Sequence, residues 1–95
     1  MPIFKGSFKD KSLRDFYCDG TTKKLPIKNT DKLRIILDYI NGIKKLPPSP
    51  IMYRAHEHTG KDKGTWSFDI TRNMRVLCEF DQDNDPINIR IEDPH

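Results

Sequence analysis

The chain has 95 residues, of which 35% are hydrophobic and 33% are charged, so it can bury one thin core. This length fits a single domain spanning residues 1–95 and leaves no room for a second one. No run approaches the roughly 18 apolar residues of a membrane-spanning helix, and the start MPIFKGSFKDK lacks the apolar stretch of a secretory signal. Two cysteines are too few for a disulfide framework or a Cys-rich zinc site. We therefore expect a small, soluble cytoplasmic domain.

The net charge of +3 conceals an uneven distribution along the chain. Residues 1–64 hold fourteen Lys and Arg against seven Asp and Glu, whereas residues 65–95 hold three against seven. A basic field of this kind attracts an RNA or DNA backbone, although solvated helix faces explain the same charges. The acidic stretch 81–85 lacks the Gly and the distal Glu of an EF-hand loop, so we interpret it as a solvated turn.

The N-terminal third predicts a short strand at residues 2–5, followed by a helix from Ser7 to Tyr17. Ser7 and Ser12 each precede an acidic residue by three positions, which is typical of a helix start. Gly20 is a natural helix stop. The apolar spacing i, i+3, i+4 that supports this helix is formed by Leu13, Phe16 and Tyr17.

A second helix is predicted over residues 29–42, where the helical pattern is strongest. Asn29 or Thr30 can cap it and Gly42 can close it. Its apolar face, which needs a partner to bury it, consists of Leu33, Ile36, Leu37 and Ile40. The prolines that follow exclude helix continuation and indicate an extended crossing; they are Pro47, Pro48 and Pro50.

After the prolines the apolar period changes from 3.6 to 2, which predicts strands. Apolar and polar residues alternate over 66–70, 74–80 and 87–91, with the pair Arg72-Asn73 as a tight hairpin link because Asn tolerates positive φ. Each strand has one apolar face that the helices can cover. The predicted fold class is α+β, with two N-terminal helices packed on one face of a small, mostly antiparallel sheet.

The opposite face of this sheet is predicted to be polar, and residues suited to phosphodiester chemistry converge there. Guanidinium and ammonium groups stabilise a phosphorane, and imidazoles move protons near neutral pH. RNA supplies its own 2′-OH as nucleophile, so such a site requires no metal and no cofactor. The candidates are His56, His58, Arg75, Asp93 and His95.

Each of these residues taken singly has a simpler explanation. Lys61 and Lys63 can be plain solvated loop charges, and Arg75 can pair with Glu79 on its own strand or with Asp69 across the hairpin. His56 and His58 alternate in an extended segment with no Cys nearby, so the sequence does not favour a zinc site.

Three further residues are interpreted as packing residues. Trp66 follows the apolar face of a strand. Cys18 and Cys78 sit in apolar patterns and are expected to be inert.

Four segments occur in a characteristic order along the chain. They are the start with Phe8-Lys-Asp-Lys11, Gly60-Lys-Asp-Lys-Gly64-Thr-Trp-Ser-Phe68, Asn73-Met-Arg-Val76 and Ile91-Glu-Asp-Pro-His95. In this order they resemble the HigB family of toxins, the plasmid maintenance killer branch of the RelE/ParE superfamily, and the resemblance covers nearly the whole chain.

The resemblance implies a RelE-like microbial RNase fold and a ribosome-dependent mRNA endonuclease that cuts mRNA in the A site and halts translation. It implies two partners: the ribosome with its mRNA, including contacts to 16S rRNA, and a helix-turn-helix antitoxin similar to HigA. The catalytic residues that it implies are His56, Arg75, Asp93 and His95. Lys61 and Lys63 would join Arg75 in holding the scissile phosphate. One departure stands out, since Pro94 occupies the position of the family's Tyr and offers neither a ring for stacking nor a hydroxyl.

Two alternatives remain open at this point. A ParE-like toxin would bind DNA gyrase without cutting RNA, and a catalytically impaired member would bind its antitoxin only. His56, Asp93 and His95 favour the nuclease, whereas Pro94 is the best support for an impaired member. The sequence does not assign the general base and the general acid between His56 and His95.

Overall fold

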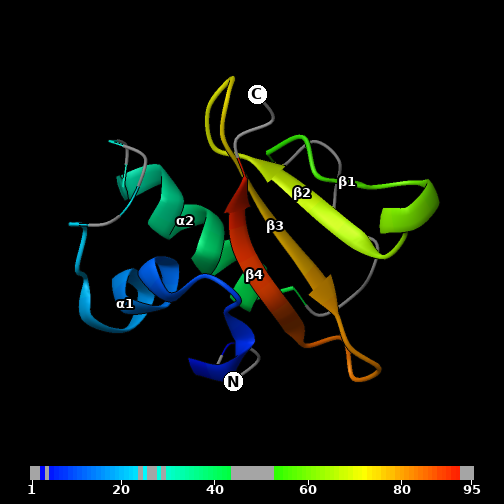
Figure 1. Ribbon diagram of the computed structural model, residues 1–95, viewed down its shortest axis with the longest axis horizontal. Coiled ribbons are helices and arrows are strands. Elements are labelled where there is room, and N and C mark those ends of the chain that lie inside the picture. Colours follow the sequence, from blue (N-terminus) through cyan, green and yellow to red (C-terminus); the bar gives the residue numbers. More distant parts are fainter. Residues whose placement is uncertain are drawn as a thin grey trace.

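The computed structural model describes residue 3, residues 5–23, residues 25 and 28, and the ranges 30–43 and 53–92. Two helices lie beside a four-stranded antiparallel sheet of order β1-β2-β3-β4 (Figure 1). The elements are α1 (Lys11–Asp19), α2 (Thr30–Asn41), β1 (His56–Glu57), β2 (Thr65–Asp69), β3 (Arg75–Phe80) and β4 (Pro86–Glu92). Short 3-10 turns occur at Lys5–Ser7 and Gly60–Asp62. This architecture confirms the predicted α+β class.

Helix α1 begins at a different cap from the two that the sequence suggests. The side chain of Asp10 accepts the backbone N–H groups of Ser12 and Leu13, at 2.9 and 3.4 Å. The predicted caps at Ser7 and Ser12 are therefore wrong, because Ser7 lies in the 3-10 turn and Ser12 already lies inside the helix. The predicted stop is confirmed, since Gly20 has φ 76° and donates its N–H to Phe16.

The apolar face of α2 forms the centre of the core, as predicted. Its four apolar residues have no exposed surface: Leu33, Ile36, Leu37 and Ile40. They join Leu13 and Phe16 of α1 and the apolar side chains of one sheet face in a single cluster. Because both helices lie on this side of the sheet (Figure 1), no helix of the described residues covers the opposite face, which is called the open face below.

The predicted strand at residues 2–5 is wrong where the structure describes it. Ile3 is not in a strand, Lys5 begins a 3-10 turn, and residues 2 and 4 lie outside the described residues. The strand-like contact comes later, as a parallel bridge between Phe8 and Ile89. The three prolines at 47, 48 and 50 also lie outside the described residues.

The β2–β3 connection is longer than the predicted two-residue link. The N–H of Ile70 donates to the Met74 carbonyl at 2.9 Å, and the Thr71 hydroxyl accepts the N–H groups of Asn73 and Met74. Asn73 has no positive φ, so the reason given for a tight turn at this residue is wrong. The Thr71 hydroxyl organises the turn instead.

Strand β4 contains a bulge that its simple alternation does not reveal. Asn88 has φ 53°, and the register shifts between Leu77, opposite Arg90, and Glu79, opposite Ile87. Ile87 consequently shares the open face with Glu79, while Ile89 and Ile91 pack against the core. A bulge of this kind adds one residue to the strand, so the β4 side chains before it lie on the sheet face opposite to the one that simple alternation predicts.

The acidic stretch 81–85 is a turn, as predicted. Asp81 accepts the N–H groups of Asp83 and Asp85 through one oxygen, at 2.9 and 3.0 Å. The three carboxylates approach within 4.8 Å of one another. Both helices described here are too short and too polar to cross a bilayer.

Candidate functional site

The open face carries two histidines from the edge strand β1 and the residue after it. His56 pairs in register with Ser67, which points away from the neighbouring core residue Phe68. His58 follows two residues later, so the side-chain alternation of extended chain places it on the same face. The two imidazole rings stack, with centroids 5.6 Å apart and an interplanar angle of 14°.

Each histidine is held by a different partner. Nδ1 of His56 lies 3.0 Å from the carbonyl oxygen of Arg54. A carbonyl can only accept, so Nδ1 carries the proton of the neutral ring and Nε2 keeps its lone pair. His58 instead bonds through Nε2 to the hydroxyl of Ser67, a residue with no exposed surface. His56 is therefore exposed with Nε2 turned away from its backbone partner, whereas His58 is half-buried and anchored.

The loop after β1 is closed by one side-chain bond and one backbone bond. A carboxylate oxygen of Glu57 accepts the N–H of Gly64 at 2.9 Å, and the N–H of Lys63 donates to Gly60 at 3.2 Å. Gly60 and Gly64 have φ values of 72° and 99°, which residues other than glycine rarely adopt. The Gly-x-x-x-Gly spacing of the sequence thus sets the shape of this loop.

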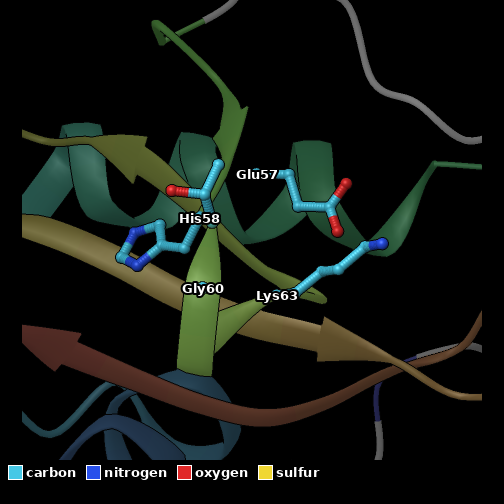
Figure 2. Close-up of a pocket in the computed structure, with 5 residues that line it drawn as sticks. Glu57, His58, Gly60 and Lys63 are labelled. Atoms are coloured by element: carbon cyan, nitrogen blue, oxygen red, sulfur yellow. The ribbon is translucent and has the colours of Figure 1, made fainter.

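Two adjoining pockets surround these residues. The first, here the arginine pocket, has a volume of about 430 Å³ and is lined by His56, Glu57, His58, Thr59 and Arg75. The second, here the lysine pocket, measures about 320 Å³ and is lined by Glu57, His58, Thr59, Gly60 and Lys63 (Figure 2). Three residues line both pockets, so the two adjoin at the β1 edge of the sheet; together they are called the depression here.

Arg75 brings a cation to this depression from β3. Neither of its suggested partners neutralises it, because Asp69 pairs with Arg54 at 3.6 Å and Glu79 pairs with Arg90 at 3.4 Å. Among the described residues, no ion pair engages the Arg75 guanidinium. This positive charge is therefore available to an anion in the arginine pocket.

The structure brings together some of the predicted site residues. His56 and Arg75 share the arginine pocket, and Lys63 lies in the adjoining one. Lys61 is exposed and lines neither pocket. Asp93 and His95 lie outside the described residues.

Two further residues line both pockets, His58 and Glu57. Sequence reasoning counted His58 among the candidates without giving it a step in the reaction, and it did not single out Glu57. In an extended segment, residues two positions apart lie on the same face, so the position of His58 two residues after His56 indicates that the two share a face. Glu57 carries no such signal, because its loop-closing bond to Gly64 depends on the fold.

The packing predictions are confirmed for two residues and wrong for one. Trp66 packs against the core and Cys78 has no exposed surface. Cys18, by contrast, is exposed on α1.

The arrangement provides an exposed imidazole, a guanidinium that no described carboxylate neutralises, and a solvent-open pocket that both line. Together with two helices on the opposite face of an antiparallel sheet, it defines a RelE-like α+β protein. Residues 6–95 match the model of the HigB-like toxin family, described as RelE-like toxins of type II toxin–antitoxin systems. The chain belongs to this HigB-like toxin family. A search among curated proteins found no match.

Proposed function

We propose that this toxin is a ribosome-dependent endoribonuclease that cuts mRNA in the ribosomal A site without a metal. One observation carries the proposal: His56, whose Nδ1 bonds the Arg54 carbonyl so that Nε2 is the nitrogen left for substrate, shares a pocket with an arginine that no described carboxylate neutralises. A base and an anion-stabilising cation in one depression are what transesterification of RNA requires.

In the proposed mechanism, His56 Nε2 takes the proton of the 2′-OH, and the resulting oxygen attacks the adjacent phosphorus. Arg75 holds the scissile phosphate and stabilises the charge of the phosphorane. The bond from phosphorus to the 5′-oxygen then breaks, and His95 gives a proton to that leaving oxygen. The products are a 2′,3′-cyclic phosphate and a 5′-OH. The nucleophile belongs to the RNA, so no metal-bound water is needed.

The assignment of the acid to His95 rests on chain geometry. Glu92, the last residue of β4, lies opposite Arg75 in the sheet register. Three further residues span at most about 11 Å, which allows His95 to reach the arginine pocket. Asp93 would orient His95 and stabilise its charged form. Pro94 offers no ring, so base stacking must come from another residue.

The proposed partners follow from family membership and charge. A type II toxin has a cognate antitoxin, which we expect to be a helix-turn-helix protein similar to HigA. The ribosome, including 16S rRNA, would present the mRNA in the cytoplasm. Exposed Lys61, together with Lys63, adds positive charge beside the depression for the RNA backbone.

Primer extension on a defined mRNA, free or programmed on ribosomes, tests the proposal. We expect cuts at A-site codons with ribosomes only, ending in a cyclic phosphate. His56→Ala should slow cutting by about 10²–10⁴-fold, the usual contribution of a general base. Lys11→Ala, an exposed change on α1, is the matched control.

Two results would contradict the proposal. Cleavage by His56→Ala within about threefold of the wild-type rate would remove His56 from the chemistry. No cutting in either sample would favour a non-cleaving member, and a gyrase supercoiling assay would then separate the ParE-like alternative from an impaired toxin.

A further inference from the structure

His58 lies in the depression, but the proposed reaction gives it no step. It lines both pockets, yet its ring bonds through Nε2 to the hydroxyl of Ser67, a residue with no exposed surface. Figure 2 shows the His58 ring pointing away from the Glu57 carboxylate. The hydrogen bond of this imidazole is therefore made to the sheet, although the residue lies at the edge of the depression.

Strand β2 holds His58 at two points. The backbone N–H of His58 donates to the Thr65 carbonyl at 2.8 Å, and the side chain bonds Ser67, two residues further along β2. Both β2 residues are buried, so neither partner moves freely. A side chain that is fixed in this way at backbone and ring can in turn fix a neighbour.

His56 is exposed and belongs to a strand of only two residues. Its Nδ1 bonds the carbonyl of Arg54, which follows Tyr53 in a backbone pair with φ values of 54° and 51°. Asp69 of β2 holds this pair, through its N–H to the Tyr53 carbonyl at 2.7 Å and an ion pair to Arg54 at 3.6 Å. A hydrogen bond at one nitrogen leaves the ring free to swing about that bond, so it does not by itself set the direction of Nε2.

The stack between the two histidines supplies the missing restraint. The ring centroids lie 5.6 Å apart with an interplanar angle of 14°, within the range of about 4.5–7 Å for offset-stacked aromatic rings. The Arg54 carbonyl holds one edge of the His56 ring, and the His58 ring holds its plane. Together these contacts set the direction of Nε2 in the pocket that His56 shares with Arg75.

We propose that His58 is a positioning residue for His56. Its ring, anchored on Ser67, holds the His56 imidazole in the orientation in which Nε2 reaches the 2′-OH. His58 itself moves no proton in the reaction. This inference rests on the proposed nuclease function and adds a residue that acts through the general base. The effect is measurable, because a displacement of about 1 Å at a reacting group can cost about 10²-fold in rate.

The test is single-turnover cleavage of mRNA on programmed ribosomes over a range of protein concentrations. This assay separates the maximal rate from the half-saturating concentration. His58→Ala removes the ring on which His56 stacks and should lower the maximal rate by about 10–100-fold. The half-saturating concentration should stay within about threefold of wild type, because a positioning residue acts on the chemical step.

Two further variants separate the ring from its nitrogens. His58→Phe keeps a planar ring for stacking but cannot move a proton, and it should recover most of the rate that His58→Ala loses. His58→Gln keeps a hydrogen-bonding group without a ring and should cut as slowly as His58→Ala. These two variants carry the test even if the alanine variant unfolds, which urea unfolding detects. Gln82→Ala, an exposed change in the turn 81–85, is the control and should cut at the wild-type rate.

Equal maximal rates for wild type and His58→Ala overturn the inference and leave the nuclease function standing. If His58→Phe is as slow as His58→Gln, the inference is also wrong, because the imidazole nitrogens would then act in the chemistry. A change confined to the half-saturating concentration overturns it as well and makes His58 an RNA contact. Absence of cutting by the wild-type protein overturns the proposed function, and this inference with it.

Discussion

At the scale of single residues, the environment separates groups of the same chemical type. His56 and His58 are both imidazoles, but one bonds a carbonyl through Nδ1 and the other bonds a buried hydroxyl through Nε2. The two cysteines differ in the same way, since Cys18 is exposed and Cys78 is buried. Residue type alone therefore identifies a candidate, and its neighbours decide what it does.

Arg75 should be the arginine whose loss matters most for RNA cleavage. Removing one group that stabilises transition-state charge commonly costs about 10²–10³-fold in rate. We expect Arg75→Ala to lose cleavage by this amount and to retain binding to its antitoxin. Arg72→Ala, an exposed change in the β2–β3 connection, should cleave at the wild-type rate. Equal effects of the two changes in a single-turnover assay would contradict the role of Arg75.

The thiol of Cys78 should resist modification. Burial raises the pKa of this thiol from 9.0 to about 12, so it stays protonated in the folded protein where an exposed thiol would ionise. We expect one reactive thiol in the native protein, Cys18, and two after denaturation. Cys18→Ser should then show none in the native state, and rapid labelling of this variant would contradict the burial of Cys78.

The same pKa shift predicts how stability depends on pH. The unfolded chain releases the Cys78 proton above about pH 9, whereas the folded chain retains it until about pH 12. The contribution of this thiol is therefore fully present below pH 9 and is lost as pH rises through that window. Urea unfolding of wild type and Cys78→Ala between pH 8 and 10 should show a steeper loss for wild type.

At the scale of elements, local patterns predict that the helices form and which face they bury, but they do not predict the residue at which α1 begins. The apolar spacing of both helices is confirmed, and so is the stop at Gly20. The caps differ because several polar residues precede α1, and only the folded backbone selects Asp10. The bulge at Asn88 shows the same limit in β4, since it depends on pairing with β3.

The cap of α1 gives a stability prediction. Asp10→Ala should lower the free energy of unfolding by about 1 kcal/mol, because it leaves the N–H groups of Ser12 and Leu13 without their acceptor. Ser12→Ala, at a position the sequence also suggested as a cap, should stay within about 0.5 kcal/mol of wild type. Urea denaturation measures both, and the reverse order would place the cap at Ser12.

At the scale of the whole molecule, the core between the helices and the sheet stabilises the platform that carries the site. Two adjacent residues of α2 test this, because Ile36 has no exposed surface and Ile35 is 55% exposed. Ile36→Ala should cost about 2–5 kcal/mol of unfolding free energy, whereas Ile35→Ala should change it by less than about 1 kcal/mol. Similar losses for both, measured by urea unfolding, would contradict the observed burial.

The sequence by itself determined the class of fold, the buried faces of both helices and the stop of α1 at Gly20. These depend on residues close together in the chain, through periods of 3.6 and 2 and through backbone preferences. Only the tertiary structure decided that His56 stacks on His58, that Arg75 shares their pocket while Asp69 and Glu79 pair elsewhere, and that Glu57 closes the loop. These contacts depend on strand register and on competition among several charged partners, neither of which a local pattern encodes.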